Sequence, residues 1–96
     1  MAGLRFEWDE RKNRANRLKH GVTFEEARTV FLDENARFMI DPDHSDDESR
    51  FLLLGLSIRV RLLLICHCHR EGDDVIRIIS ARRADPTERR EYARWL

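Results

Sequence analysis

The stretch Val-Ile-Arg-Ile-Ile-Ser-Ala-Arg-Arg-Ala-Asp-Pro-Thr-Glu-Arg-Arg-Glu-Tyr, residues 75–92, decides the fold of the C-terminal part of the chain. Its first half is rich in isoleucine and valine and predicts a buried strand over residues 74–83. Asp85 as N-cap, Pro86 at the first helical position and Glu88 at the third then predict a helix. Arginines on a rigid strand beside a carboxylate suit a phosphate ligand, because guanidinium is a planar, permanently charged fork of donors.

Outward from this stretch, three further strands are expected at residues 36–41, 50–56 and 61–69, and their short connections favour antiparallel pairing. Nearer the N-terminus, a short strand is expected at residues 4–7. Two helices follow it, one from the N-cap Asp9 to His20 with Gly21 as its stop, and one capped by Thr23. The first helix carries only a narrow apolar line, so most of it is expected to face solvent or a partner. That line is Trp8, Ala15, Leu18 and Val22.

The expected fold class is therefore α+β, with a short N-terminal strand, two helices, a four-stranded antiparallel sheet and a C-terminal helix in a single domain over residues 1–96. The helices are expected to cover one face of the curved sheet. The other face would then be available for a ligand.

The charge of the chain is balanced in total but uneven along the sequence. The 96 residues carry a formal net charge of zero, which argues against a general binder of polyanions. Residues 5–19 nevertheless hold six basic and three acidic side chains, and so do residues 77–94. The fold could join these two segments into one cationic face, whereas the acidic residues 41–48 read as a solvated loop. Two cysteines and the lack of a long apolar segment favour the cytoplasm and no membrane association.

The run Cys66-His67-Cys68-His69 looks like a set of zinc ligands. In a strand, however, the cysteines point to one face and the histidines to the other, so one ion cannot take all four. We therefore expect Cys66 to continue the buried row of Leu62 and Leu64, with no metal bound. The histidines on the opposite face could grip RNA or transfer a proton, because histidine titrates near neutral pH.

Simple alternation divides the strand arginines into two pairs. Arg82 shares a face with Ser80, and Arg77 is expected to share a face with Arg83. Arg77 lies between apolar residues, so it requires a solvent-lined cleft or a carboxylate partner such as Glu48 or Glu88. Alternation alone leaves open which pair looks into a cleft.

Two helix ends have both an ordinary and a functional interpretation. Lys19 and His20 suit the last turn of a helix before Gly21, and they could equally contact a phosphate or a ribose hydroxyl. Glu88 could simply cap the last helix while Tyr92 packs in the core. Alternatively, Tyr92 could stack on a base or contact a phosphate.

With these residues in hand, the chain resembles the BrnT family of type II toxins. The ordered combination of motifs extends over nearly the whole chain and is far more specific than any one part of it. In the turn after Leu56-Ser57, similar sequences often have a glycine, and this chain has Ile58-Arg59-Val60-Arg61 instead. The matching motifs are Phe6-Glu7-Trp8-Asp9-Glu10 with Lys12 and Asn16, Lys19-His20-Gly21-Val22-Thr23-Phe24-Glu25-Glu26-Ala27, Val30-Phe31-Leu32-Asp33, Glu48 with Arg50, Gly55-Leu56-Ser57, and Arg77-Ile78-Ile79-Ser80-Ala81-Arg82-Arg83-Ala84 with Glu88 and Tyr92.

The resemblance implies a RelE-like fold and a toxin that cleaves RNA without metal or cofactor, inhibiting translation and growth. In such a mechanism arginines stabilise the charge on the phosphorane while other groups move protons. Arg77 and Arg82 are the candidates for transition-state stabilisation with Arg50 in support, and His20, His67 and Glu88 compete for the acid and base roles. The candidates for RNA binding are Lys19, Ser80, Arg83 and Tyr92.

The resemblance also implies neutralisation by a BrnA-like antitoxin with a ribbon-helix-helix domain, so that operator DNA is contacted only through the antitoxin. A rival hypothesis is a non-catalytic protein-binding module or co-repressor that acts through such a partner. Cleavage of RNA by the partner-free protein separates the two hypotheses.

Overall fold

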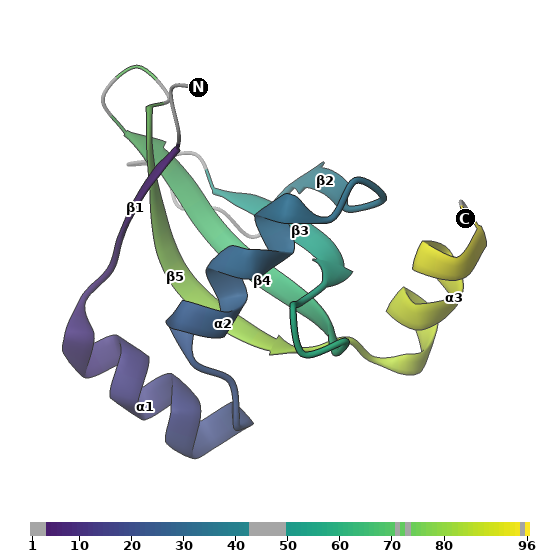
Figure 1. Ribbon diagram of the computed structural model, residues 1–96, viewed down its shortest axis with the longest axis horizontal. Helices are drawn as coiled ribbons and strands as arrows, with labels where there is room; N and C mark the ends of the chain where they lie inside the picture. Colours follow the sequence, from purple (N-terminus) through teal and green to yellow (C-terminus); the bar gives the residue numbers. More distant parts are fainter. Residues whose placement is uncertain (1–3, 43–49, 71, 73, 95) are drawn as a thin grey trace.

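The computed structural model describes residues 4–42, 50–70, 72, 74–94 and 96 (Figure 1). The expected order of elements is present, and their bounds differ from the predicted ranges by only a residue or two. A single turn of 3-10 helix extends the second helix. The elements are β1 (Arg5–Glu7), α1 (Glu10–His20), α2 (Phe24–Thr29), η1 (Val30–Leu32), β2 (Arg37–Ile40), β3 (Phe51–Leu56), β4 (Leu62–Arg70), β5 (Val75–Arg83) and α3 (Pro86–Arg94).

The sheet has five strands, in the order β1-β5-β4-β3-β2, rather than the four expected. The α+β class holds, and β2 to β5 form the predicted antiparallel ladder. The additional strand is β1, which pairs in parallel with β5 from Arg5 opposite Val75 to Glu7 opposite Arg77. Sequence alone cannot pair so short a strand, because its partner is about 70 residues away along the chain.

One face of the sheet, which we call the helix face, carries the main core. Helix α2 lies across it, as Figure 1 shows, and the apolar side chains of this helix are fully buried against Leu53, Ile65 and Ile78. Thr23 caps α2 as predicted, since its hydroxyl accepts a hydrogen bond from the Glu26 N–H at 3.1 Å. The α2 side of this core consists of Val22, Phe24, Ala27 and Val30.

The opposite face, which we call the open face, is only partly covered. Helix α3 lies at its far end, where Tyr92 packs with Leu54 and Leu64. The expectation that all helices cover one face is therefore wrong for α3. The reason is that Ala84 and Asp85 turn the chain round the end of β5 before α3 begins. The remainder of the open face carries the candidate site.

Helix α1 itself is anchored by two asparagines, and only the flanking ends of the expected apolar line, Trp8 and Val22, pack against the core. Its buried side chains are Asn13 and Asn16, whereas Ala15 is exposed and Leu18 is 82% exposed. Asn16 donates to the carbonyl of Ala81 and accepts from the Ala81 N–H, at 2.8 and 3.1 Å. These bonds continue the pairing of the β5 edge beyond the end of β1. The predicted caps of α1, Asp9 and Gly21, are both confirmed.

A β-bulge in β5 corrects the predicted faces of the arginines. Cys66 pairs with Ser80 but His67 pairs with Ile78, so Ile79 is an extra residue on β5. One inserted residue reverses the alternation before it. Arg77 consequently lies on the open face with Ser80 and Arg82, and not with Arg83.

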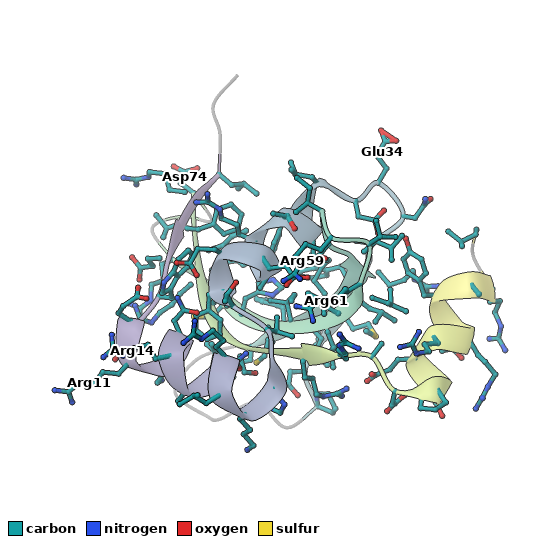
Figure 2. All side chains as sticks on the ribbon, turned by 60° about the horizontal axis from the view of Figure 1, so that its bottom comes forward. Arg11, Arg14, Glu34, Arg59, Arg61 and Asp74 are labelled. Carbon is teal, nitrogen blue, oxygen red and sulfur yellow. The ribbon has the colours of Figure 1, made fainter. Side chains whose placement is uncertain are left out.

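A buried ion pair joins the turn after β3 to α2 and to the end of α1. Arg61 donates hydrogen bonds to both carboxylate oxygens of Glu26 and to the carbonyl of Gly21, and Ser57 donates to the same carboxylate. Figure 2 shows Arg59 and Arg61 lying together here. Arg61 holds the pKa of Glu26 below its usual range, so this carboxylate stays charged although it is only 6% exposed.

The described part of the chain contains no helix that is long and apolar enough to cross a membrane.

Candidate active site

A cleft of about 350 Å³ lies on the open face, between the end of α1, the middle of β5 and the start of β3. Four of the residues selected from the sequence meet in it, namely His20, Arg50, Ser80 and Arg82. The described residues that line it are His20, Asp41, Arg50, Leu52, Leu64, Cys66, Ser80, Ala81 and Arg82.

The β5 wall of the cleft follows from strand alternation. Ser80 and Arg82 both project from the open face, on either side of Ala81, whose side chain is buried in the main core. A hydroxyl and a guanidinium two residues apart therefore reach the same side of the sheet. The prediction that Ser80 and Arg82 share a face of the sheet is confirmed.

Arg82 is held rigidly at this wall. Its two terminal nitrogens donate to the two carboxylate oxygens of Glu88, at 2.8 and 2.9 Å, and one of them also donates to the Arg83 carbonyl at 3.1 Å. Glu88 and Asp85 cap α3 reciprocally, each accepting from the backbone N–H of the other. The helix cap thus fixes Glu88, and Glu88 fixes the guanidinium.

The α1 wall is positioned by Asn16, the side chain that bonds to the backbone of β5 beyond the end of β1. Asn16 bonds to Ala81, and its amide also donates to the Val22 carbonyl at 2.8 Å, just beyond the end of α1. His20 lies four residues after Asn16, one turn along the helix. The end of α1 is therefore tied to β5 between Ser80 and Arg82, which brings the imidazole into the cleft.

The third wall contains two residues that the sequence analysis did not select, Asp41 and Cys66. The Cys66 thiol lies 3.7 Å from a carboxylate oxygen of Asp41, and burial together with this carboxylate raises the pKa of Cys66 to about 11. The thiol therefore stays protonated at neutral pH. Alternation correctly placed Cys66 on the face of Leu64, but the residue was interpreted as part of a buried row, and Asp41 as the start of a solvated acidic loop.

Arg77 lies on the open face but outside the cleft. Its guanidinium donates to Glu7 at 3.0 Å, and Arg70 lies 3.6 Å from the same carboxylate oxygen. Of the two alternatives that the sequence left open, the structure shows a carboxylate partner, but it is the strand neighbour Glu7 and not Glu88. Glu48, the other expected partner, lies outside the described residues.

His67 is in the main core and has no exposed surface. Its ring contacts those of Phe31, Phe38 and Phe51, with centroids 5.0 to 6.0 Å apart. Burial, with a smaller effect of His69, lowers the pKa of His67 to about 4, so the ring is neutral at pH 7. A side chain in this position cannot reach RNA in the cleft.

The remaining candidates are also separate from the cleft lining. Tyr92 is buried and donates to Asp33 at 2.6 Å, and burial together with that carboxylate raises its pKa to about 12. Arg83 lies on the helix face, in a hollow shared with Arg61 and Arg89. Lys19 is exposed at the end of α1, next to His20.

The cysteines and histidines of β4 point to opposite faces, as alternation predicts. Cys66 lies opposite Leu52 of β3 on the open face, and His67 lies opposite Phe51 of β3 on the helix face. In the described ranges, no three His, Cys, Asp or Glu side chains are grouped so that they could hold a metal ion.

A family model and a solved structure are similar to this chain. The family model described as "Ribonuclease toxin, BrnT, of type II toxin-antitoxin system" matches residues 8–88. The crystal structure of the Brucella abortus ribonuclease toxin BrnT is similar with a TM-score of 0.63 and 23% sequence identity, covering 85% of this chain and 97% of that one. At this identity the similarity shows the fold. No curated protein matches the sequence.

Proposed function

Because the chain belongs to the BrnT family of ribonuclease toxins of type II toxin-antitoxin systems, we propose that residues 1–96 act as one toxin domain that cleaves RNA in the open-face cleft without a metal ion. Cleavage of RNA in the cytoplasm would inhibit translation and growth. The observation that supports this proposal is the meeting of His20, Arg50, Ser80 and Arg82 in one cleft.

The proposed reaction is attack of a ribose 2′-hydroxyl on the adjacent phosphorus. A bond forms between the 2′-oxygen and phosphorus, and the bond from phosphorus to the 5′-oxygen breaks. The hydroxyl proton passes to a base, and an acid gives a proton to the departing 5′-oxygen. The products are a 2′,3′-cyclic phosphate and a 5′-hydroxyl end, and no oxidant or cofactor is consumed.

Arg82 and Arg50 are assigned to the charge that grows on the phosphorane oxygens. Arg82 suits this role because its fork is already oriented by Glu88 and loses little freedom on binding. Ser80 can donate a hydrogen bond to a phosphate oxygen from the same wall. The raised pKa makes the Cys66 thiol a poor proton donor at neutral pH, and we assign the two proton transfers to the other titratable groups of the cleft, His20 and Asp41. Glu88 is a positioning residue.

We further propose that the antitoxin partner implied by the family is a BrnA-like protein with a ribbon-helix-helix domain. The toxin would then contact operator DNA only through this partner. Co-purification with a small DNA-binding protein tests the pairing separately from catalysis.

The proposed chemistry is tested with the partner-free protein, a labelled RNA and an excess of chelator. We expect cleavage that leaves 2′,3′-cyclic phosphate ends. Arg82→Ala, Arg50→Ala and His20→Ala should each lower the rate by roughly a hundredfold or more. Arg83→Ala is the matched control, since it removes the neighbouring guanidinium from the opposite face. Cleavage that persists in both Arg82→Ala and His20→Ala, or that requires an added metal ion, would contradict the proposal.

A further inference from the structure

Helix α1 carries a strong local excess of positive charge next to the cleft. It has five cationic side chains and one anionic side chain, and all six are exposed. The whole chain has no net charge, so this local excess is balanced by acidic residues elsewhere in the chain. The cationic side chains are Arg11, Lys12, Arg14, Arg17 and Lys19.

The contacts of α1 sort these cations onto different sides of the helix. Asn13 accepts from the Phe24 N–H at 2.8 Å, so the side next to it faces α2. Arg14 and Arg17 lie on that side, in a groove with the carboxylates of Glu10 and Glu25. The positive charge of Arg14 and Arg17 is therefore partly compensated by these two carboxylates. Figure 2 shows Arg11 and Arg14 pointing away from the sheet.

Lys12 and Lys19 lie on the other side of the helix. Together with Asn16 they follow the spacing i, i+4, i+7, which places all three on one stripe. Asn16 is bonded to β5 at Ala81, and α2 covers the helix face. The stripe consequently runs along the open-face side of α1, beside the cleft that contains His20. Within the described part of the chain, neither lysine forms a salt bridge.

We propose that Lys12 and Lys19 form a binding edge for the phosphates of single-stranded RNA that flank the bond being cleaved. The two lysines are about 10 Å apart along the helix axis, which is enough for each to contact a separate phosphate. This edge would join the basic segment 5–19 to Arg82 of the segment 77–94, next to Arg50 in the cleft. The inference rests on the proposed ribonuclease function, since it assumes that the strand occupies the cleft.

Binding is measured by fluorescence anisotropy with a single-stranded 2′-O-methyl oligonucleotide, which cannot be cleaved because its 2′-oxygen is blocked. The dissociation constant is determined as a function of salt concentration. For a single strand, each phosphate contact contributes about 0.7 to the slope of log K against log salt. Lys12→Gln and Lys19→Gln should each make the slope less steep by about that amount, and the double variant should make it less steep by about 1.4.

The matched control is the double variant Arg14→Gln with Arg17→Gln, which removes two charges from the compensated side of the same helix. We expect its slope to be that of the wild type. Equal losses in the two double variants, an unchanged slope in the lysine variant, or no binding by the wild type would each overturn the inference. Cleavage of unmodified RNA is followed in parallel. A wild type that binds but does not cleave contradicts the proposed function alone.

Discussion

The guanidinium of Arg82 and the carboxylate of Glu88 form a bidentate ion pair, with hydrogen bonds of 2.8 and 2.9 Å, across the junction between β5 and α3. The pair connects the cap of a helix to the wall of the cleft, because Glu88 also accepts from the Asp85 N–H. Helix α3 therefore supports the wall of the candidate site through Glu88. We propose that the role of this helix is to orient the arginine.

Glu88→Gln should lower RNA cleavage by about tenfold while the protein stays folded. The amide retains an acceptor for the Asp85 N–H but presents only one oxygen and no charge to the arginine fork. Arg82→Lys should be more damaging, because an ammonium cannot reproduce the fork. Single-turnover cleavage rates and circular dichroism of the variants test this. Full activity in Glu88→Gln would show that Arg82 does not depend on its partner.

Gly55→Ala should destabilise the fold by about 1–3 kcal/mol, as overpacked core positions do. A Cβ at this position would lie 2.9 Å from both the Ala36 Cβ and the Val30 Cγ1. Urea unfolding measures the loss. Adding Ala36→Gly to Gly55→Ala removes one of these close contacts and should restore part of the stability. A wild-type midpoint in the single variant would refute this account.

Val60→Gly should stabilise the protein by about 1 kcal/mol, because a left-handed backbone is strained for any residue with a Cβ. Val60 has a φ of 60° and is 77% exposed, so its replacement loses little packing. Ile58→Gly is the control, since Ile58 is equally exposed without a positive φ, and it should destabilise. Thermal unfolding of the two variants decides the point.

The fold was largely predictable because its signals are local. Caps at Asp9, Thr23 and Asp85, the glycine stop at Gly21 and period-two strands each depend on a few neighbouring residues. The features that were mispredicted depend on distant partners. Strand β1 pairs with the distant strand β5, and Asn13 and Asn16 are buried because they bond to residues far away in the sequence.

The candidate site was predictable only in part for the same reason. Ser80 and Arg82 follow from alternation within one strand. Arg77 was assigned to the wrong face because nothing local in the run of isoleucines marks Ile79 as the bulge. His67 was taken as reachable because alternation gives two faces without saying which one α2 covers.

Asn16→Ala should lower stability by about 2 kcal/mol or more, because it leaves the buried N–H and carbonyl of Ala81 and the Val22 carbonyl without their partner. It should also lower the cleavage rate at temperatures where the variant is folded, since His20 loses its tie to β5. Asn13→Ala is the matched control. That amide is equally buried but bonds to Phe24, Glu10 and Glu25. It should destabilise without a comparable loss of turnover, and equal kinetic losses would contradict a positioning role for Asn16.

The buried histidine predicts how stability depends on pH. Burial lowers the pKa of His67 from 6.5 to about 4 in the folded protein. Between these two values the unfolded chain binds a proton that the folded protein does not, so stability falls as pH falls. The contribution of His67 is fully present above pH 6.5 and is lost at up to about 1.4 kcal/mol per pH unit down to about pH 4. His67→Phe removes the titrating group from a site already surrounded by aromatic rings. The variant should therefore lose the part of the pH dependence of stability that comes from one proton, up to about 1.4 kcal/mol per pH unit. Urea unfolding from pH 4 to pH 8 measures the difference, with the half-buried His20→Gln as control. If His67→Phe and the wild type lose stability in parallel across this range, some other group is responsible for the acid sensitivity.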